Sequence, residues 1–195
     1  MKVILASNSK QRQDILKMVG LKYDVMLSNI EESSTKKDPY EYVKELSLNK
    51  ALNVSSRLKE NAIIIGADTI VFKDNKIYEK PKSLEEAAQN IKEFSASKNT
   101  VITGITIIDK YNDKKISVAT SADVYFREVD SEEITWYINN ESKIFKSCGY
   151  VPHGKAATFI ERIEGDYNTI LGLSPNVLFK TLKKLGYKAT DFDFE

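Results

Sequence analysis

The stretch that decides the fold comes at the very start, where residues 3–16 read VILASNSKQRQDIL. Its first four residues are apolar and typical of a strand, and its end has the spacing of a helix. Ser7 and Ser9 form a hydroxyl-bearing turn between them, and Arg12 lies in the first helical turn. A helix N-terminus suits an anion such as phosphate, because it presents unpaired N–H groups and a positive dipole end. The simpler interpretations are that Ser9 caps the helix and Arg12 is a solvated charge.

Composition and charge exclude several classes of protein. The 195 residues suit one domain with one core, or two small lobes around a cleft. The 29 basic and 28 acidic side chains leave a net charge of only +1. The chain therefore lacks the overall basic excess that would indicate a nucleic-acid or anionic membrane partner. Cys148 is the sole cysteine, which precludes an internal disulfide and fits a reducing compartment. The sequence shows no charged leader, and no apolar run approaches the roughly 20 residues that a membrane span needs. We therefore expect a cytoplasmic protein.

Strand and helix patterns alternate along the whole chain. The main predicted elements are a helix at 39–57, a buried strand at 63–67, two long strands within 101–126, a strand at 157–163 and a helix from Ser174 to Gly186. Asp38 and Pro39 support the first of these, as a cap and a favoured first helical residue. The strands within 101–126 look antiparallel. We therefore predict a single α/β domain, residues 1–195, with a mixed sheet.

Two acidic positions are candidates for chemistry. Asp68 comes directly after the buried apolar run, in the sequence GADT, and a carboxylate at the end of a buried strand is costly unless it is paired. Such a group is often a base or a metal ligand, and a turn carboxylate satisfied by backbone N–H groups is an equal alternative. Glu31 and Glu32 are adjacent, so at most one enters a shared cleft. With Asp68, one of them would make an oxygen-rich site for Mg²⁺ or Mn²⁺; the commoner interpretation is a solvated acidic pair.

Three basic positions stand out less strongly. Lys50 interrupts the apolar face of the predicted helix at 39–57, although a lysine that reaches out to solvent is the simpler explanation. Lys80 precedes Pro81 in a loop that would suit a polyphosphate, but exposed lysines usually serve solubility. His153 is the sole histidine, and it does not make a zinc site with one distant cysteine.

Several nucleotide and hydrolase motifs are absent from the sequence. It holds no Walker A sequence, no G-x-G-x-x-G and no G-x-S-x-G. A P-loop NTPase, a Rossmann dehydrogenase and an ordinary α/β-hydrolase are therefore disfavoured.

Taken in order, the motifs of residues 3–185 resemble the Maf family of nucleoside triphosphate pyrophosphatases. The family opening S-x-S-P-R-R appears as SNSKQR, and the G-A-D-T signature is intact. The other matches are Glu32, Lys50 in NKA, Lys80-Pro81, residues 150–154, and residues 161–173, which follow the pattern E-x-I-x-G-x-Y-x-x-x-x-G-L. Each is weak alone, and together they cover nearly the whole chain.

The resemblance implies a fold and a reaction. The fold would be an elongated, curved mixed sheet flanked by helices, with two lobes around a cleft, as in inosine triphosphatases. The reaction would convert a nucleoside triphosphate and water to a monophosphate and pyrophosphate, with Mg²⁺ or Mn²⁺. Asp68 would activate water, and Glu32 would assist it or share the metal with it. The phosphates would be bound by Ser7, Ser9, Arg12, Lys50 and Lys80. Family members are often dimers, which makes a homodimer possible.

Two departures bear on the substrate. Gln11 replaces the first arginine of the family's R-R pair, and His153 replaces a glutamine carried by members acting on dTTP and UTP. Together with Thr69, these positions are associated with base choice in the family. The substrate is therefore left open among dTTP, UTP, CTP and modified nucleotides. A non-catalytic nucleotide- or nucleic-acid-binding regulator of cell division is the rival hypothesis, and an enzyme that removes a single phosphate is a third.

Overall fold

The computed structural model describes residues 1–30 and 33–195, and this part of the chain divides into two compact units. The first unit consists of Met1–Thr69, Ile102–Thr120 and Asn168–Glu195. The second unit consists of Ile70–Val101 and Ser121–Tyr167. Helices and strands alternate in both units, as the sequence predicts.

The strands form a mixed sheet in the order β2-β1-β3-β5-β6-β7, with β4 paired to β3 off this path. Their bounds are β1 (Val3–Leu5), β2 (Asp24–Val25), β3 (Ile63–Lys73), β4 (Lys76–Tyr78), β5 (Lys98–Asp109), β6 (Lys114–Phe126) and β7 (Ile160–Gly165). Strand β1 is parallel to β2 and β3, whereas β4 is antiparallel to β3 and β7 is antiparallel to β6. A connection as short as that between β5 and β6 allows only an antiparallel pair. The predicted mixed sheet is therefore confirmed.

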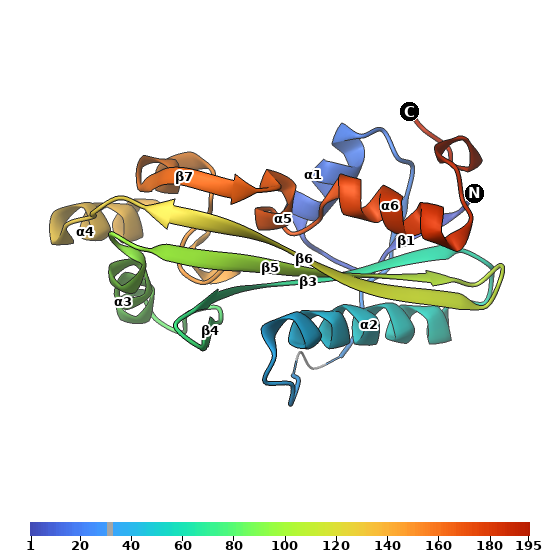
Figure 1. Ribbon diagram of the computed structural model, residues 1–195, viewed down its shortest axis with the longest axis horizontal. Helices are drawn as coiled ribbons and strands as arrows, with labels where there is room; N and C mark the ends of the chain where they lie inside the picture. The colour runs from blue at the N-terminus through green and yellow to red at the C-terminus, as the bar shows by residue number, and fades with distance from the viewer. Residues whose placement is uncertain (31–32) are drawn as a thin grey trace. The chain divides into compact units, whose positions relative to one another are not determined.

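In the first unit, helices cover both faces of the strands. The helices are α1 (Lys10–Met18), α2 (Pro39–Arg57), α6 (Pro175–Leu185) and the short α5 (Tyr167–Ile170), of which Tyr167 belongs to the second unit. Figure 1 shows α2 along one face of β3 and β5, with α1 and α6 on the other. Alternate side chains of β3 face α2 on one side and α1 and α6 on the other, because successive side chains of a strand point to opposite faces. Ile65 packs in the core with α1 and α6, and Ile64 packs with Ala51 and Val54 of α2.

Helix α2 lies directly against the backbone of two strands. A Cβ atom on Gly66 of β3 would come within 2.2 Å of the Ser47 carbonyl oxygen, and one on Gly104 of β5 equally close to that of Val43. Only glycine permits so close an approach. The Asp38 side chain caps the first turn by accepting from two backbone N–H groups. The Asp38 cap fixes the residue at which α2 begins, and the two glycines allow α2 to pack closely on the strands. The helix spans the predicted residues 39–57.

The second unit is built on aromatic packing. Its helices are α3 (Leu84–Phe94) and α4 (Ser131–Asn140), with 3₁₀ turns η1 (Ile144–Lys146) and η2 (Gly154–Thr158). The rings of Phe126 and Tyr150 meet edge to face, with centroids 5.0 Å apart, and Phe94 packs against both. Such pairs add roughly 0.5–1.5 kcal/mol beyond the area that they bury.

The predicted strand at residues 157–163 is wrong in its first half. Strand β7 begins at Ile160, and residues 154–158 form the 3₁₀ turn η2 instead. Within η2, the Thr158 hydroxyl donates to the Lys155 carbonyl oxygen at 2.8 Å, and Ala156 is fully buried. Local hydrogen bonding and burial of one small side chain therefore override the strand pattern at this point.

No helix among residues 1–30 and 33–195 combines the length and the apolar character needed to cross a bilayer.

Candidate functional site

The first part of the site is a buried ion pair between α2 and β3. Lys50 Nζ donates to Asp68 Oδ1 at 2.6 Å, and each residue is 5% exposed. Gly66 lies two residues before Asp68 and therefore faces α2 as well. The close approach at Gly66 brings the helix near enough for Lys50 to reach the carboxylate.

This geometry rules out one alternative for each residue. Asp68 lies within β3 rather than at its end, because the strand continues to Lys73, and residues 71–73 pair with β4. The carboxylate is ion-paired rather than held in a turn, and Lys50 is buried rather than extended into solvent. A buried ion pair contributes little net stability, because desolvation offsets its attraction, so its presence favours a functional role.

The second part of the site surrounds Arg12. The guanidinium donates through Nη1 to Ser7 Oγ at 3.0 Å, through Nη2 to Thr69 Oγ1 at 3.0 Å and through Nε to the Gly172 carbonyl oxygen at 2.9 Å. Arg12 is 9% exposed, so the interpretation as a solvated surface charge is wrong. A cation held at the first turn of a helix adds positive potential where the helix dipole is already positive, and this favours an anionic ligand.

The two serines of the opening turn differ in their contacts. Ser7 Oγ accepts from the backbone N–H of Ser9 at 3.2 Å and from Arg12. Both contacts use the oxygen, which leaves the hydroxyl hydrogen for a further acceptor. Ser9 is the N-cap of α1, and its hydroxyl accepts from the backbone N–H of Arg12 at 3.5 Å. The cap interpretation of Ser9 is confirmed, and a contact with substrate stays a prediction.

Three other predicted residues take no part in the hydrogen bonds described so far. Gln11 is half-buried in the first turn of α1. Lys80 and His153 belong to the second unit, where Lys80 is exposed after β4 and His153 precedes η2 without a side-chain cap bond. Glu32 lies outside the described residues.

Two residues that the sequence did not single out also contact Arg12 or its partner Thr69. Thr103 of β5 is fully buried, with Oγ1 2.9 Å from Thr69 Oγ1. Gly172 has a φ of +99°, and a Cβ there would lie 3.1 Å from Thr69 Oγ1 and 3.2 Å from Arg12 Nε. Gly172 is the glycine near the end of the motif at residues 161–173, which was a usable signal, whereas nothing in the sequence marked Thr103.

Among the described residues, one carboxylate of the site, that of Asp68, is suited to bind a divalent metal. Within residues 1–30 and 33–195, no group of three His, Cys, Asp or Glu side chains comes together to hold a metal ion. Mg²⁺ commonly binds through only one or two carboxylates, with water and substrate phosphates completing its octahedron. Asp68 is a carboxylate of this kind.

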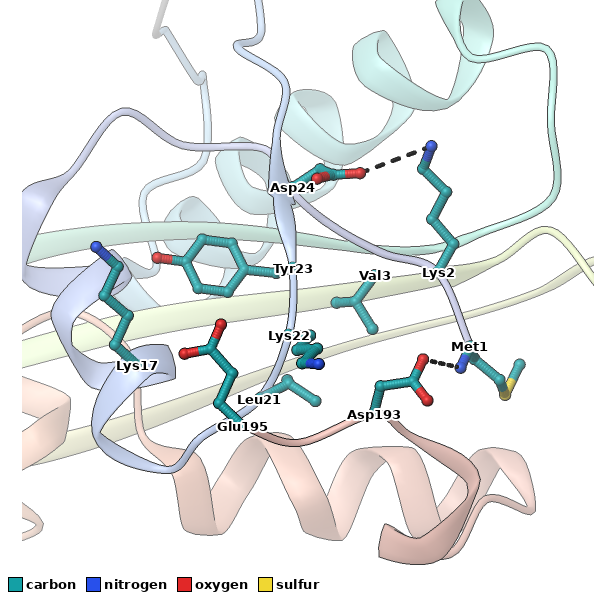
Figure 2. Close-up of a pocket in the computed structure, with 10 residues that line it drawn as sticks. All are labelled: Met1, Lys2, Val3, Lys17, Leu21, Lys22, Tyr23, Asp24, Asp193 and Glu195. Carbon is teal, nitrogen blue, oxygen red and sulfur yellow. Dashed lines mark hydrogen bonds and ion pairs between the residues drawn. The ribbon is translucent and has the colours of Figure 1, made fainter.

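A separate pocket lies at the other end of β1. Figure 2 shows it beside the chain termini. Its volume is about 610 Å³. It is lined by Met1, Lys2, Val3, Lys17, Leu21, Lys22, Tyr23, Asp24, Asp193 and Glu195. The N-terminal ammonium group pairs with Asp193 at 2.9 Å, and Lys2 pairs with Asp24 at 3.6 Å. None of the predicted site residues that the structure describes lines this pocket, so it is not the candidate site.

The fold and the site together define an α/β protein with a buried lysine–aspartate pair and a hydrogen-bonded arginine at a helix N-terminus. Residues 2–185 match the family described as Maf-like protein. The chain therefore belongs to the Maf family, as its motifs predict.

Known relatives cover nearly the same span. A dTTP/UTP pyrophosphatase from Thermoanaerobacter sp. (strain X514) is 41% identical over 184 residues, which is 94% of this chain and 96% of the relative. One of the same description from Clostridium perfringens (strain SM101 / Type A) is 40% identical over 185 residues, with the same coverage. Among solved structures, the Staphylococcus aureus Ham1 protein matches with a TM-score of 0.44 and 14% identity, over 65% of this chain and 72% of that one.

Proposed function

We propose that this protein is a nucleoside triphosphate pyrophosphatase that hydrolyses dTTP, UTP or related nucleotides to the monophosphate and pyrophosphate. The names of relatives at 40–41% identity support the reaction class. The observation that carries the proposal is the Asp68 carboxylate, buried in β3 and paired with Lys50. A protein that only bound phosphates would gain nothing from a carboxylate beside anions, whereas hydrolysis needs one to activate water.

In the proposed reaction, water attacks the α-phosphorus atom. A bond forms between the water oxygen and this phosphorus, and the bridging bond to the β-phosphate breaks, with its electron pair leaving on pyrophosphate. Asp68 accepts the proton that the water loses. The hydrogen bond from Lys50 fixes the orientation of the carboxylate, so that it meets the water in one direction.

Charge neutralisation is the other requirement, because phosphoryl transfer depends mainly on positioning and electrostatics. Arg12 supplies a fixed positive charge, and Ser7 has a hydroxyl hydrogen for a phosphate oxygen. We assign Lys80 to the same task. Bound Mg²⁺ or Mn²⁺ would neutralise further phosphate charge, and Asp68 with Glu32 would hold it.

The proposal for the preferred nucleotide base rests on the relatives and on two residues, Gln11 and His153, that depart from the family pattern. The printed activity of the relatives makes dTTP and UTP the first substrates to test. Gln11 and His153 still carry groups that hydrogen-bond to a base edge, and histidine can also stack. We propose that these two residues contact the base.

The remaining assignments are proposals of the same kind. We propose a housecleaning role, a cytoplasmic location, a single functional domain and a homodimer, with no nucleic-acid or membrane partner. The rival hypothesis of a non-catalytic regulator receives no support from the relatives, whose descriptions name enzymes.

The test is a panel of natural and modified nucleoside triphosphates with Mg²⁺ or Mn²⁺, in which pyrophosphate and monophosphate are measured together. Asp68→Asn should lower turnover by roughly 10²–10⁴-fold, the usual effect of removing a general base. Asp109→Asn is the matched control, because Asp109 is also buried in the first unit but accepts from Tyr111 and Asn112 in a turn. Unchanged turnover in Asp68→Asn, or no pyrophosphate from any nucleotide, would overturn the proposal.

A further inference from the structure

The hydroxyl of Thr103 contacts two groups next to Arg12. Thr103 Oγ1 lies 2.8 Å from the Thr169 carbonyl oxygen and 2.9 Å from Thr69 Oγ1. A carbonyl oxygen only accepts, and a threonine hydroxyl has one hydrogen to donate. Thr103 therefore donates to the Thr169 carbonyl and accepts from Thr69.

The direction of the bond at Thr69 follows from that at Thr103. Its one hydrogen goes to Thr103, so its oxygen accepts from Arg12 Nη2 at 3.0 Å. The hydrogen bonds then run in one direction, from Arg12 through the two threonine hydroxyls to the Thr169 carbonyl. Thr69 consequently has no hydrogen left to donate to a base, although its oxygen keeps one lone pair that can accept.

A second route leads from the same carbonyl back to Arg12. The Thr169 carbonyl oxygen also accepts from the Gly172 backbone N–H at 3.1 Å, and the Gly172 carbonyl oxygen accepts from Arg12 Nε at 2.9 Å. The two routes close a ring of hydrogen bonds through Arg12, Thr69, Thr103, Thr169 and Gly172, which we call the Arg12 ring. In this ring, Thr103 joins the side chain of Thr69 to the Thr169 carbonyl of the turn that carries Gly172, and Arg12 joins Thr69 to Gly172 from the other side.

We propose that Thr103 is a positioning residue for Arg12, which holds the guanidinium in the orientation that the nucleotide phosphates require. The proposal rests on the proposed function for the role of Arg12, and on the ring for that of Thr103. Thr103 is fully buried and its hydroxyl hydrogen is already donated, so it acts through the ring without touching substrate.

The chain offers a matched control on the same strand. Thr106 is also fully buried, and its hydroxyl lies 2.8 Å from Ser47 Oγ and 2.8 Å from Ser117 Oγ. None of these three residues belongs to the Arg12 ring. Thr103→Val and Thr106→Val therefore make the same chemical change, the loss of a buried hydroxyl with two hydroxyl or carbonyl partners, inside and outside the ring.

The kinetic test compares the two valine variants with Thr103→Ser, which keeps the hydroxyl. We expect Thr103→Val to lower kcat/KM for the best nucleotide by on the order of tenfold to a hundredfold, as misplaced binding groups do. Thr103→Ser should restore most of the activity, and Thr106→Val should stay within about twofold of wild type, because its lost bonds do not reach Arg12. Equal kinetic effects of the two valine variants would overturn the proposal, even if both proteins melt at lower temperature.

A spectroscopic test does not depend on turnover. The chain has four arginines, so the side-chain Nε–H signals of ¹⁵N-labelled protein are few, and Arg12→Lys assigns the signal of Arg12. We expect exchange of this proton with water to be about tenfold faster in Thr103→Val, but not in Thr103→Ser or Thr106→Val, since the bond to Gly172 opens more often. Unchanged exchange in Thr103→Val would overturn the proposal. If wild type releases no pyrophosphate, the proposed function fails while this signal still decides whether Thr103 positions Arg12.

Discussion

Asp68 and Thr69 are neighbours in β3, yet their side chains are held from opposite faces of the strand. Asp68 accepts from Lys50 of α2, whereas Thr69 accepts from Arg12 of α1. The alternation of side chains along a strand requires this separation. The carboxylate proposed for water activation is thus adjacent in the chain to Thr69, the residue that accepts from the arginine proposed for phosphate binding. The spacing between Asp68 and Thr69 is fixed because they are consecutive residues.

The Lys50–Asp68 pair should show strong coupling in stability. Lys50→Met leaves a buried carboxylate without its cation, and we expect it to lower the free energy of unfolding by about 3–5 kcal/mol. The double variant Lys50→Met, Asp68→Asn should be more stable than that single variant, because it removes the uncompensated charge. Denaturant unfolding of the wild type, both single variants and the double variant measures this coupling, and additive losses would contradict it.

The close approach of α2 should make Gly66 intolerant of a side chain. In Gly66→Ala, the new Cβ would meet the Ser47 carbonyl oxygen, so α2 must shift outward and carry Lys50 away from Asp68. We expect a loss of about 1–3 kcal/mol in stability, together with a fall in pyrophosphate release. Leu52→Ala, on the exposed side of the same helix, is the control and should change stability by only about 0.5 kcal/mol. A Gly66→Ala protein with full stability and activity would show that α2 does not depend on this contact.

The second unit should lose stability in acid through Glu93. The hydrogen bond from the Tyr78 hydroxyl, at 2.6 Å, is the largest of several interactions that together lower the pKa of Glu93 from 4.5 to about 2. Burial raises the pKa of Tyr78. Because the pKa of this carboxyl is lower in the folded state, its stabilisation is complete above about pH 4.5 and disappears as the pH falls towards 2.

Thermal melting between pH 2 and pH 6 checks this expectation. Wild type should exceed Glu93→Gln in stability at the upper end of this range, and the difference should shrink as the solution becomes more acidic. A difference that is the same at every pH would show that Glu93 does not titrate with folding.

Cys148 should report the opening of the second unit. Burial raises the pKa of its thiol to about 12, and the residue is 5% exposed, so little reactive thiolate exists in the native protein. We expect slow alkylation by iodoacetamide at pH 8, which accelerates in urea as the unit opens. Asn90→Ala should accelerate it without urea, because Asn90 Nδ2 donates to the Cys148 carbonyl oxygen at 2.9 Å. Immediate labelling of the native wild type would contradict the burial argument.

Local signals in the sequence were sufficient for much of the fold. The helix at residues 39–57 follows from its Asp38 cap and Pro39, and the buried strand at 63–67 follows from its apolar run. These predictions succeed because caps, proline and apolar burial act within a few residues. The strand at 157–163 failed in part, because its pattern does not separate a 3₁₀ turn from the start of a strand.

By itself, the sequence determined the family, the mixed α/β class and the identity of Asp68, Lys50, Arg12 and Ser7 as candidate residues, since motifs and periodicity are local. The tertiary structure alone decided their partners. It paired Lys50 with Asp68 through the close approach at Gly66, and it placed Thr103 and Gly172 around Arg12. These contacts join residues up to 160 positions apart, and no local pattern encodes them because they arise from how the strands and helices pack.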